Sequence, residues 1–156
     1  MKEHGDMSYE DLKEKTAVAV TRFNNLSAEI KDLESQMSDN AELQKQIINY
    51  AKTRVVYAEY RKSGYSKKFR AEHETEILLH QAAKKHFDSL GDKKLPHVRA
   101  LREQYQILLT QKCKAYSAYK QAREEMKELY NVKSNVEHLL NISEHDNERE
   151  REKTRR

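Results

Sequence analysis

Residues that interrupt helices are scarce in this chain of 156 residues, which has one proline, three glycines and no tryptophan. Sheet proteins rely on glycine and proline at their turns, so this composition argues against a fold built on strands. Hydrophobic residues make up 37% of the chain and the mean hydropathy is −1.08, which is too polar for a broad globular core. Long helices that each bury a narrow apolar stripe suit such a chain.

Two further absences concern the cellular setting. The sequence contains no apolar run of about eighteen residues, so we expect no membrane insertion. The segment MKEHGDMSYED lacks the apolar stretch of a secretory signal, and the single cysteine, Cys113, cannot form an intramolecular disulfide. These features favour a protein of the reducing cytoplasm.

An apolar pattern at helical spacing is the strongest feature that is present. Its steps alternate between three and four residues for about six heptads, and only two of its members are charged. The pattern consists of Val98, Leu101, Tyr105, Leu108, Lys112, Ala115, Tyr119, Ala122, Met126, Leu129, Lys133, Val136 and Leu140. Such a repeat predicts one very long helix packed against a partner helix.

A second apolar stripe with the same spacing runs through the first part of the chain. Its members are Leu12, Thr16, Ala19, Phe23, Leu26, Ile30, Leu33 and Met37. We expect a helix over residues 8–37 that begins with Ser8 and Asp11 as a capping pair. We expect the segment SDN at 38–40 to end this helix, and a second helix over 41–63 to fold back against it.

A third helix is predicted from Ser66 to Leu90, after Gly64 and before Gly91, because glycine favours the position just past a helix end. Pro96 is expected in the first turn of the last helix. The sequence therefore predicts an all-α fold, an elongated antiparallel helical bundle or coiled coil of about four helices over residues 1–142. Residues 143–156 have no apolar side chain, so we expect a charged, disordered tail there.

Patterns typical of active sites are missing from the sequence. There is no glycine-rich phosphate loop, no nucleophile elbow and no Glu-x-x-His motif. His73, Glu76 and His80 share one helical face, but no ligand from another helix can be identified to complete a metal site. We therefore expect no catalytic residue, no metal and no cofactor, and we predict that this chain is not an enzyme.

Positive charge is concentrated where the second and third predicted helices meet. The formal net charge is only +4, yet between residues 52 and 70 seven basic residues are opposed by Glu59 alone. Five of these cations are expected to contact phosphate, namely Arg61, Lys62, Lys67, Lys68 and Arg70, with Tyr60 and Tyr65 as groups on which bases stack. Cations interleaved with aromatic rings suit single-stranded DNA. The alternative is a solvated corner whose tyrosines only cover the core.

Several blocks of the sequence are similar to a known family. GYSKKF, ILLHQAAKKHF and KKLP are the most specific of them, and the likeness covers nearly the whole chain. Together they resemble the C-terminal region of relaxases, the mobilisation nucleases of bacterial conjugative and mobilisable elements. The resemblance implies a non-catalytic domain, since the histidine cluster and the strands of the relaxase nuclease have no counterpart here.

The resemblance also implies partners. As part of a mobilisation protein acting in conjugation, this domain is expected to bind DNA, single-stranded or close to the transfer origin, and to dock onto relaxosome or secretion-system proteins. The alternative function is a protein-interaction scaffold, either a homodimeric coiled coil or an adaptor, without direct DNA binding. The apolar stripe between Met126 and Leu140 favours that alternative, because an unpartnered stripe promotes association.

Overall fold

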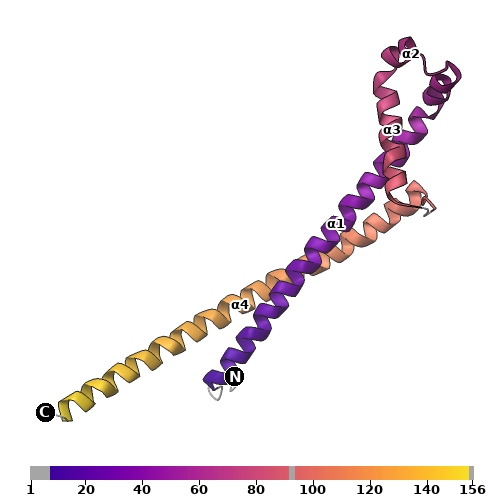
Figure 1. Cartoon of the computed structure of the whole chain (residues 1–156). Coiled ribbons are helices and arrows are strands. Elements are labelled where there is room, and N and C mark those ends of the chain that lie inside the picture. The colour runs from indigo at the N-terminus through magenta and orange to yellow at the C-terminus, as the bar shows by residue number, and fades with distance from the viewer. Residues whose placement is uncertain (1–7, 92–93, 155–156) are drawn as a thin grey trace. The chain divides into compact units, whose positions relative to one another are not determined.

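In the computed structural model, residues 8–91 and 94–154 are described, and every regular element among them is an α-helix. The helices are α1 (Tyr9–Lys62), α2 (Lys67–Glu72), α3 (Glu74–Ser89) and α4 (Val98–Thr154). The all-α prediction is confirmed, and so is the great length of the last helix, which has 57 residues. Figure 1 shows the four helices in chain order.

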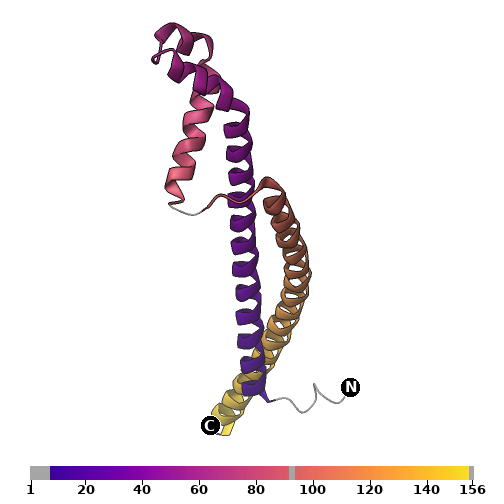
Figure 2. The ribbon, with the colours of Figure 1, turned by 90° about the vertical axis from the view of Figure 1, so that its right-hand side faces the viewer.

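The chain divides into two compact units, and both α1 and α4 contribute to each. Unit 1 contains residues up to Lys31 together with Cys113 onward, and unit 2 contains Asp32–Lys112. In unit 1 the first part of α1 and the part of α4 that precedes Glu137 lie side by side in opposite directions (Figure 2). Tyr9 contacts Glu137 and Arg22 contacts Glu125, as an antiparallel pair requires.

The apolar stripes predicted from the sequence form the buried seams of both units. In unit 1 the buried members include Leu12 and Ala19 of α1 with Ala115 and Ala122 of α4. Phe23 stacks on Tyr119 with ring centroids 4.9 Å apart, which fills the space between the small alanine layers. At the far end Leu140 is 46% exposed, so the seam of α4 ends before this residue.

The prediction of two separate helices over 8–37 and 41–63 is wrong, because α1 is continuous from Tyr9 to Lys62. Asn40, which we expected to help end a helix, is a buried member of the seam. Its Nδ2 donates to the Leu101 carbonyl of α4 at 3.0 Å, and its Oδ1 accepts from Gln44 Nε2 at 2.6 Å. These bonds satisfy the buried amide, and tertiary packing thereby overrides the weak helix propensity of Ser, Asp and Asn.

Because α1 does not reverse direction, its second half has a different partner. Residues 50–60 pack against α3 within unit 2, through contacts of Tyr50 with Phe87 and of Tyr57 with His80. On this part of α1 Thr53 is buried, whereas Arg54 and Val55 are exposed.

The helix expected from Ser66 to Leu90 is divided at His73 into α2 and α3. The division allows Phe69 of α2 and His80 of α3 to face different tyrosines of α1. Leu78 and Leu79 of α3 are 48% and 39% exposed, so this side of the helix is open to solvent. Gly91 has the positive φ, +77°, that suits its predicted place after a helix end.

The two ends of α4 also differ from the predictions. Pro96 precedes the helix instead of lying in its first turn, because the Leu101 amide donates to the His97 carbonyl at the helix start. The charged segment that we expected to be disordered is helical as far as Thr154, where the threonine hydroxyl bonds to the Glu150 carbonyl. Residues 155 and 156 of the predicted tail lie outside the described residues.

Candidate functional site

The predicted basic segment forms a tight corner between α1 and α2, which we call the basic corner (residues 60–70). α1 ends there in a Schellman motif, in which the Gly64 amide donates to the Arg61 carbonyl and the Tyr65 amide donates to the Tyr60 carbonyl. Gly64 has φ +71°, and Tyr65 is also left-handed at +60°. Glycine adopts such a value easily, whereas a tyrosine needs support from its surroundings.

That support comes from an aromatic contact and from two serines. The Tyr65 ring meets the Tyr60 ring edge to face at 5.3 Å, which is the apolar contact that commonly accompanies a Schellman motif. Ser63 Oγ donates to the Tyr60 carbonyl and accepts from the Ser66 amide. Ser66 then caps α2 by accepting from the Phe69 amide, as the sequence predicted. Hydrogen bonds therefore hold the backbone of the corner from Tyr60 to Phe69.

All five predicted phosphate-binding cations are on the surface of the basic corner. Arg61 and Lys62 belong to the last turn of α1, and Lys67, Lys68 and Arg70 belong to α2. Among the ion pairs of the described residues, none involves these five side chains. Their charges are thus available to an external anion, unlike that of Arg22 or Lys112, which pairs with a glutamate of the facing helix.

The two predicted stacking tyrosines have different environments. Tyr65 is 57% exposed, so one side of its ring is open to a base. Tyr60 is only 6% exposed, because its ring lies among Tyr57, Tyr65 and Phe69. The stacking role that we expected for Tyr60 is therefore corrected: this residue is part of the core that supports the corner.

A buried histidine beneath the corner was not identified from the sequence as a packing residue. His80 is 4% exposed and lies between the rings of Tyr50 and Tyr57, with centroid distances of 4.6 and 4.2 Å. Thr53 Oγ1 donates to the Asn49 carbonyl at 2.7 Å and lies within hydrogen-bond distance of His80 Nδ1, at 3.0 Å. Burial lowers the pKa of His80, and the positive charge of Lys84 lowers this pKa further. The spacing of Tyr50, Thr53 and Tyr57 was the available signal, since they share one face of α1.

The same contacts decide how the histidine face of α3 is used. His73 Nδ1 lies 3.1 Å from Glu76 Oε2, whereas His80 points into the tyrosine stack. Across residues 8–91 and 94–154, no three histidine, cysteine, aspartate or glutamate side chains converge in a way that would hold a metal ion. In the same part of the chain, no helix is long and apolar enough to cross a membrane.

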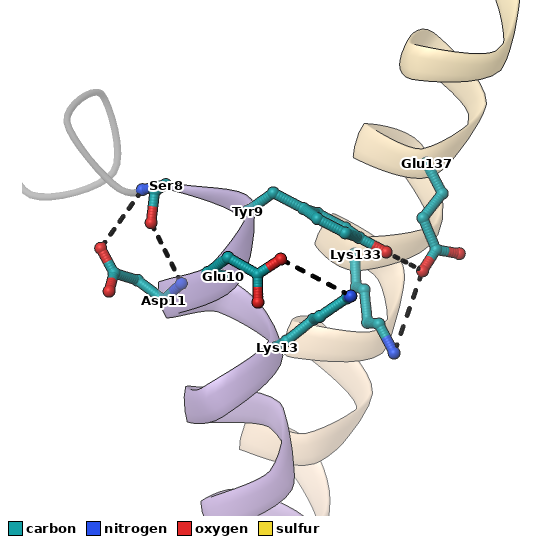
Figure 3. A network of polar contacts seen from close by, with 7 residues as sticks. All are labelled: Ser8, Tyr9, Glu10, Asp11, Lys13, Lys133 and Glu137. Carbon is teal, nitrogen blue, oxygen red and sulfur yellow. Dashed lines mark hydrogen bonds and ion pairs between the residues drawn. The ribbon is translucent and has the colours of Figure 1, made fainter.

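Unit 1 contains a polar clamp at the start of α1, shown in Figure 3. Ser8 and Asp11 cap the helix reciprocally, which confirms the predicted capping pair. The Tyr9 hydroxyl donates to Glu137 Oε1 at 2.6 Å, and the same oxygen lies 3.9 Å from Lys133 Nζ. The hydrogen bond to Glu137 raises the pKa of Tyr9. This clamp joins the start of α1 to α4 within unit 1.

No protein-family model, curated protein or solved structure matches this chain. The function must therefore be argued from the geometry of the two units and from the residues themselves.

Proposed function

We propose that this chain is a non-catalytic helical module that binds the phosphate backbone of DNA through its basic corner. The observation that supports this proposal is the placement of five exposed cations on a capped, hydrogen-bonded turn beside the exposed ring of Tyr65. Nonspecific DNA affinity comes from neutralising phosphates, and an aromatic face adds stacking with unpaired bases. Single-stranded DNA is therefore the ligand that suits this surface.

The resemblance to relaxases supports a role in DNA mobilisation. The block GYSKKF comprises the two left-handed residues, the helix cap, two of the cations and Phe69, which packs on Tyr60. The most specific part of the resemblance is thus also the part that builds the basic corner. In this setting the module would hold DNA near the nick made by a nuclease domain and would dock onto relaxosome or secretion-system proteins.

Charge reversal within α2 tests the proposal. We expect Lys67→Glu with Lys68→Glu to lower the affinity of the full chain for a labelled single strand by at least about tenfold, measured by fluorescence anisotropy. The matched control is Lys31→Glu with Lys45→Glu, which changes the net charge equally at two exposed sites of α1 outside the corner. Equal losses in both variants would reduce the effect to net charge and contradict the proposal.

Tyr65 provides a second, independent test, which compares binding of single-stranded DNA with binding of duplex DNA. Tyr65→Ala removes a stacking surface worth about 1–3 kcal/mol for each base, so binding of a single strand should weaken at least about fivefold. Binding of duplex DNA should change little, because its bases are already stacked. If the wild-type chain binds neither form of DNA, the proposal fails and the scaffold function without DNA binding replaces it.

A further inference from the structure

Unit 1 exposes apolar side chains beside its seam, where a two-stranded coiled coil normally has charges. On α4 these are Tyr116, Tyr130, Val132 and Leu139, with exposed fractions from 46% to 65%. On α1, Val18 is 63% exposed. Apolar residues on the flanks of a seam widen the stripe, and wide stripes are typical of helices with more than one neighbour.

Val18 and Val132 belong to the same depression of unit 1. This groove has a volume of about 1170 Å³, and the apolar part of its lining comes from both helices. That part consists of Leu12, Val18, Ala19, Leu129, Val132 and Val136. A shallower groove of about 560 Å³ continues along α1, where Ala17 and Thr21 are small enough to allow another helix to approach closely.

We propose that the occupant of this groove is α1 of a second copy of the chain, lying antiparallel about a twofold axis at Val18. Two copies of unit 1 then form a four-helix bundle in which Val18 faces Val18 of the second copy and the side of α4 at Val132 covers this contact. The proposal concerns unit 1 alone and does not depend on DNA binding by the basic corner.

The charges along α1 match this symmetry. Glu14 and Arg22 each lie four residues from Val18, on opposite sides, and both line the two grooves. In an isologous interface residue i meets residue j twice, so Glu14 of each copy faces Arg22 of the other. Arg22 also lies 3.3 Å from Glu125 of its own chain, so in the dimer its guanidinium bridges two carboxylates.

The size of the face is comparable with that of a stable dimer interface. The segment of α1 in unit 1 is Tyr9–Lys31, which at about 1.5 Å per residue is roughly 35 Å long. Two helices side by side are about 20 Å wide, so the face covers roughly 700 Å² per copy. Stable interfaces bury about 800 Å² per partner, which is of the same order.

Sedimentation equilibrium of the full chain over a wide concentration range tests the proposal. We expect wild type to reach twice its mass of 18.5 kDa, and Val18→Glu to weaken association at least about tenfold, because each dimer buries two glutamates. The matched control is Val55→Glu, at a 68% exposed valine of α1 in unit 2, which should associate like wild type. Circular dichroism confirms that each variant keeps its helices.

A charge swap identifies the antiparallel arrangement itself. Arg22→Glu combined with Glu125→Arg keeps an ion pair within the chain but should weaken association, because it places Glu14 of one copy against a glutamate of the other. Adding Glu14→Arg should restore association, since the swapped pair is again complementary across the axis. A chain that stays monomeric at every concentration, a Val18→Glu variant that dimerises like wild type, or a swap that restores nothing would each overturn the proposal.

Discussion

His80 combines three interactions in one buried side chain: two aromatic stacks and a hydrogen bond to Thr53. All of them join α3 to α1 within unit 2, and all are compatible with a neutral imidazole. The unfolded chain exposes this group, so its pKa there returns toward the ordinary value of 6.5. At the residue scale, the stability of unit 2 is therefore linked to proton uptake.

The sign of this linkage follows from the lowered pKa of His80 in the folded chain. At pH values above 6.5, His80 is neutral in both the folded and the unfolded chain, so its buried contacts stabilise the fold in full. As the pH falls below 6.5 the unfolded state binds the proton first, so the contribution is progressively lost until the folded pKa is passed.

We therefore expect the free energy of unfolding of wild type to fall between pH 7 and pH 5, and to fall less in His80→Phe. Phenylalanine keeps a ring between the two tyrosines but does not titrate, and Thr53 still donates to the Asn49 carbonyl. Urea unfolding at a series of pH values measures the difference. An identical pH dependence in the two proteins would show that His80 is not the linked group.

At the scale of the helices, Asn40 fixes how α1 pairs with α4 in unit 2. A single buried amide in an apolar seam favours the one register in which it is bonded, at some cost in stability. Here the bonded register places Asn40 beside Leu101 and places Glu34 3.3 Å from Lys112.

Replacing Asn40 by an apolar residue tests whether the buried amide lowers the stability of the seam. We expect Asn40→Leu to raise the free energy of unfolding by about 1 kcal/mol, because an apolar group then fills the seam. The control Ser38→Leu, at an exposed site of the same turn, should change it by less than about 0.5 kcal/mol. Urea unfolding provides both values. A loss of stability in Asn40→Leu would mean that the amide network, not the seam, dominates here.

The neighbouring residues Ile77 and Leu78 of α3 provide a second test, because Ile77 is fully buried and Leu78 is 48% exposed. Ile77→Ala should cost about 2–4 kcal/mol through lost burial and the cavity it leaves. Leu78→Ala should cost less than about 1 kcal/mol, since little of its surface is removed from water. Similar losses in thermal unfolding would show that the outer face of α3 is covered.

The sequence predicted elements best where a single period continued. The stripes from Leu12 to Met37 and from Val98 to Val136 follow a strict three–four alternation, and both form seams. The sequence does not predict the continuity of α1, because Ser, Asp and Asn in succession are typical of a helix end. The stripe in fact continues three residues after Met37, at Asn40, and then at Gln44 and Ile47. Which polar residues a partner helix satisfies depends on the tertiary structure, so propensity alone did not reveal it.

The same distinction holds for the candidate site. Charge density identified the five exposed cations, because charged side chains at a helix end rarely become buried. The fate of each tyrosine could not be predicted in this way: Tyr60 is buried and Tyr65 is exposed, although both border the same turn. Their difference arises from the left-handed backbone at Gly64 and Tyr65, which directs one ring onto the other.

At the scale of the whole molecule, the two proposed activities belong to different units. Unit 2 carries the basic corner, and unit 1 carries the groove at Val18. The formal net charge of +4 is small, so a general electrostatic attraction to DNA is weak and local charge must account for binding. Because the two surfaces lie in different units, variants in one unit are expected to leave the activity of the other unit intact.

The salt dependence of single-strand affinity tests the central claim, that the basic corner contacts phosphate, most directly. Each neutralised phosphate of a single strand contributes about −0.7 to the slope of log K against log salt, so three to five contacts give a slope of about −2 to −3.5. Lys67→Glu with Lys68→Glu should reduce the magnitude of this slope by at least about 1.4. A slope near zero in wild type, or an unchanged slope in the variant, would contradict the account.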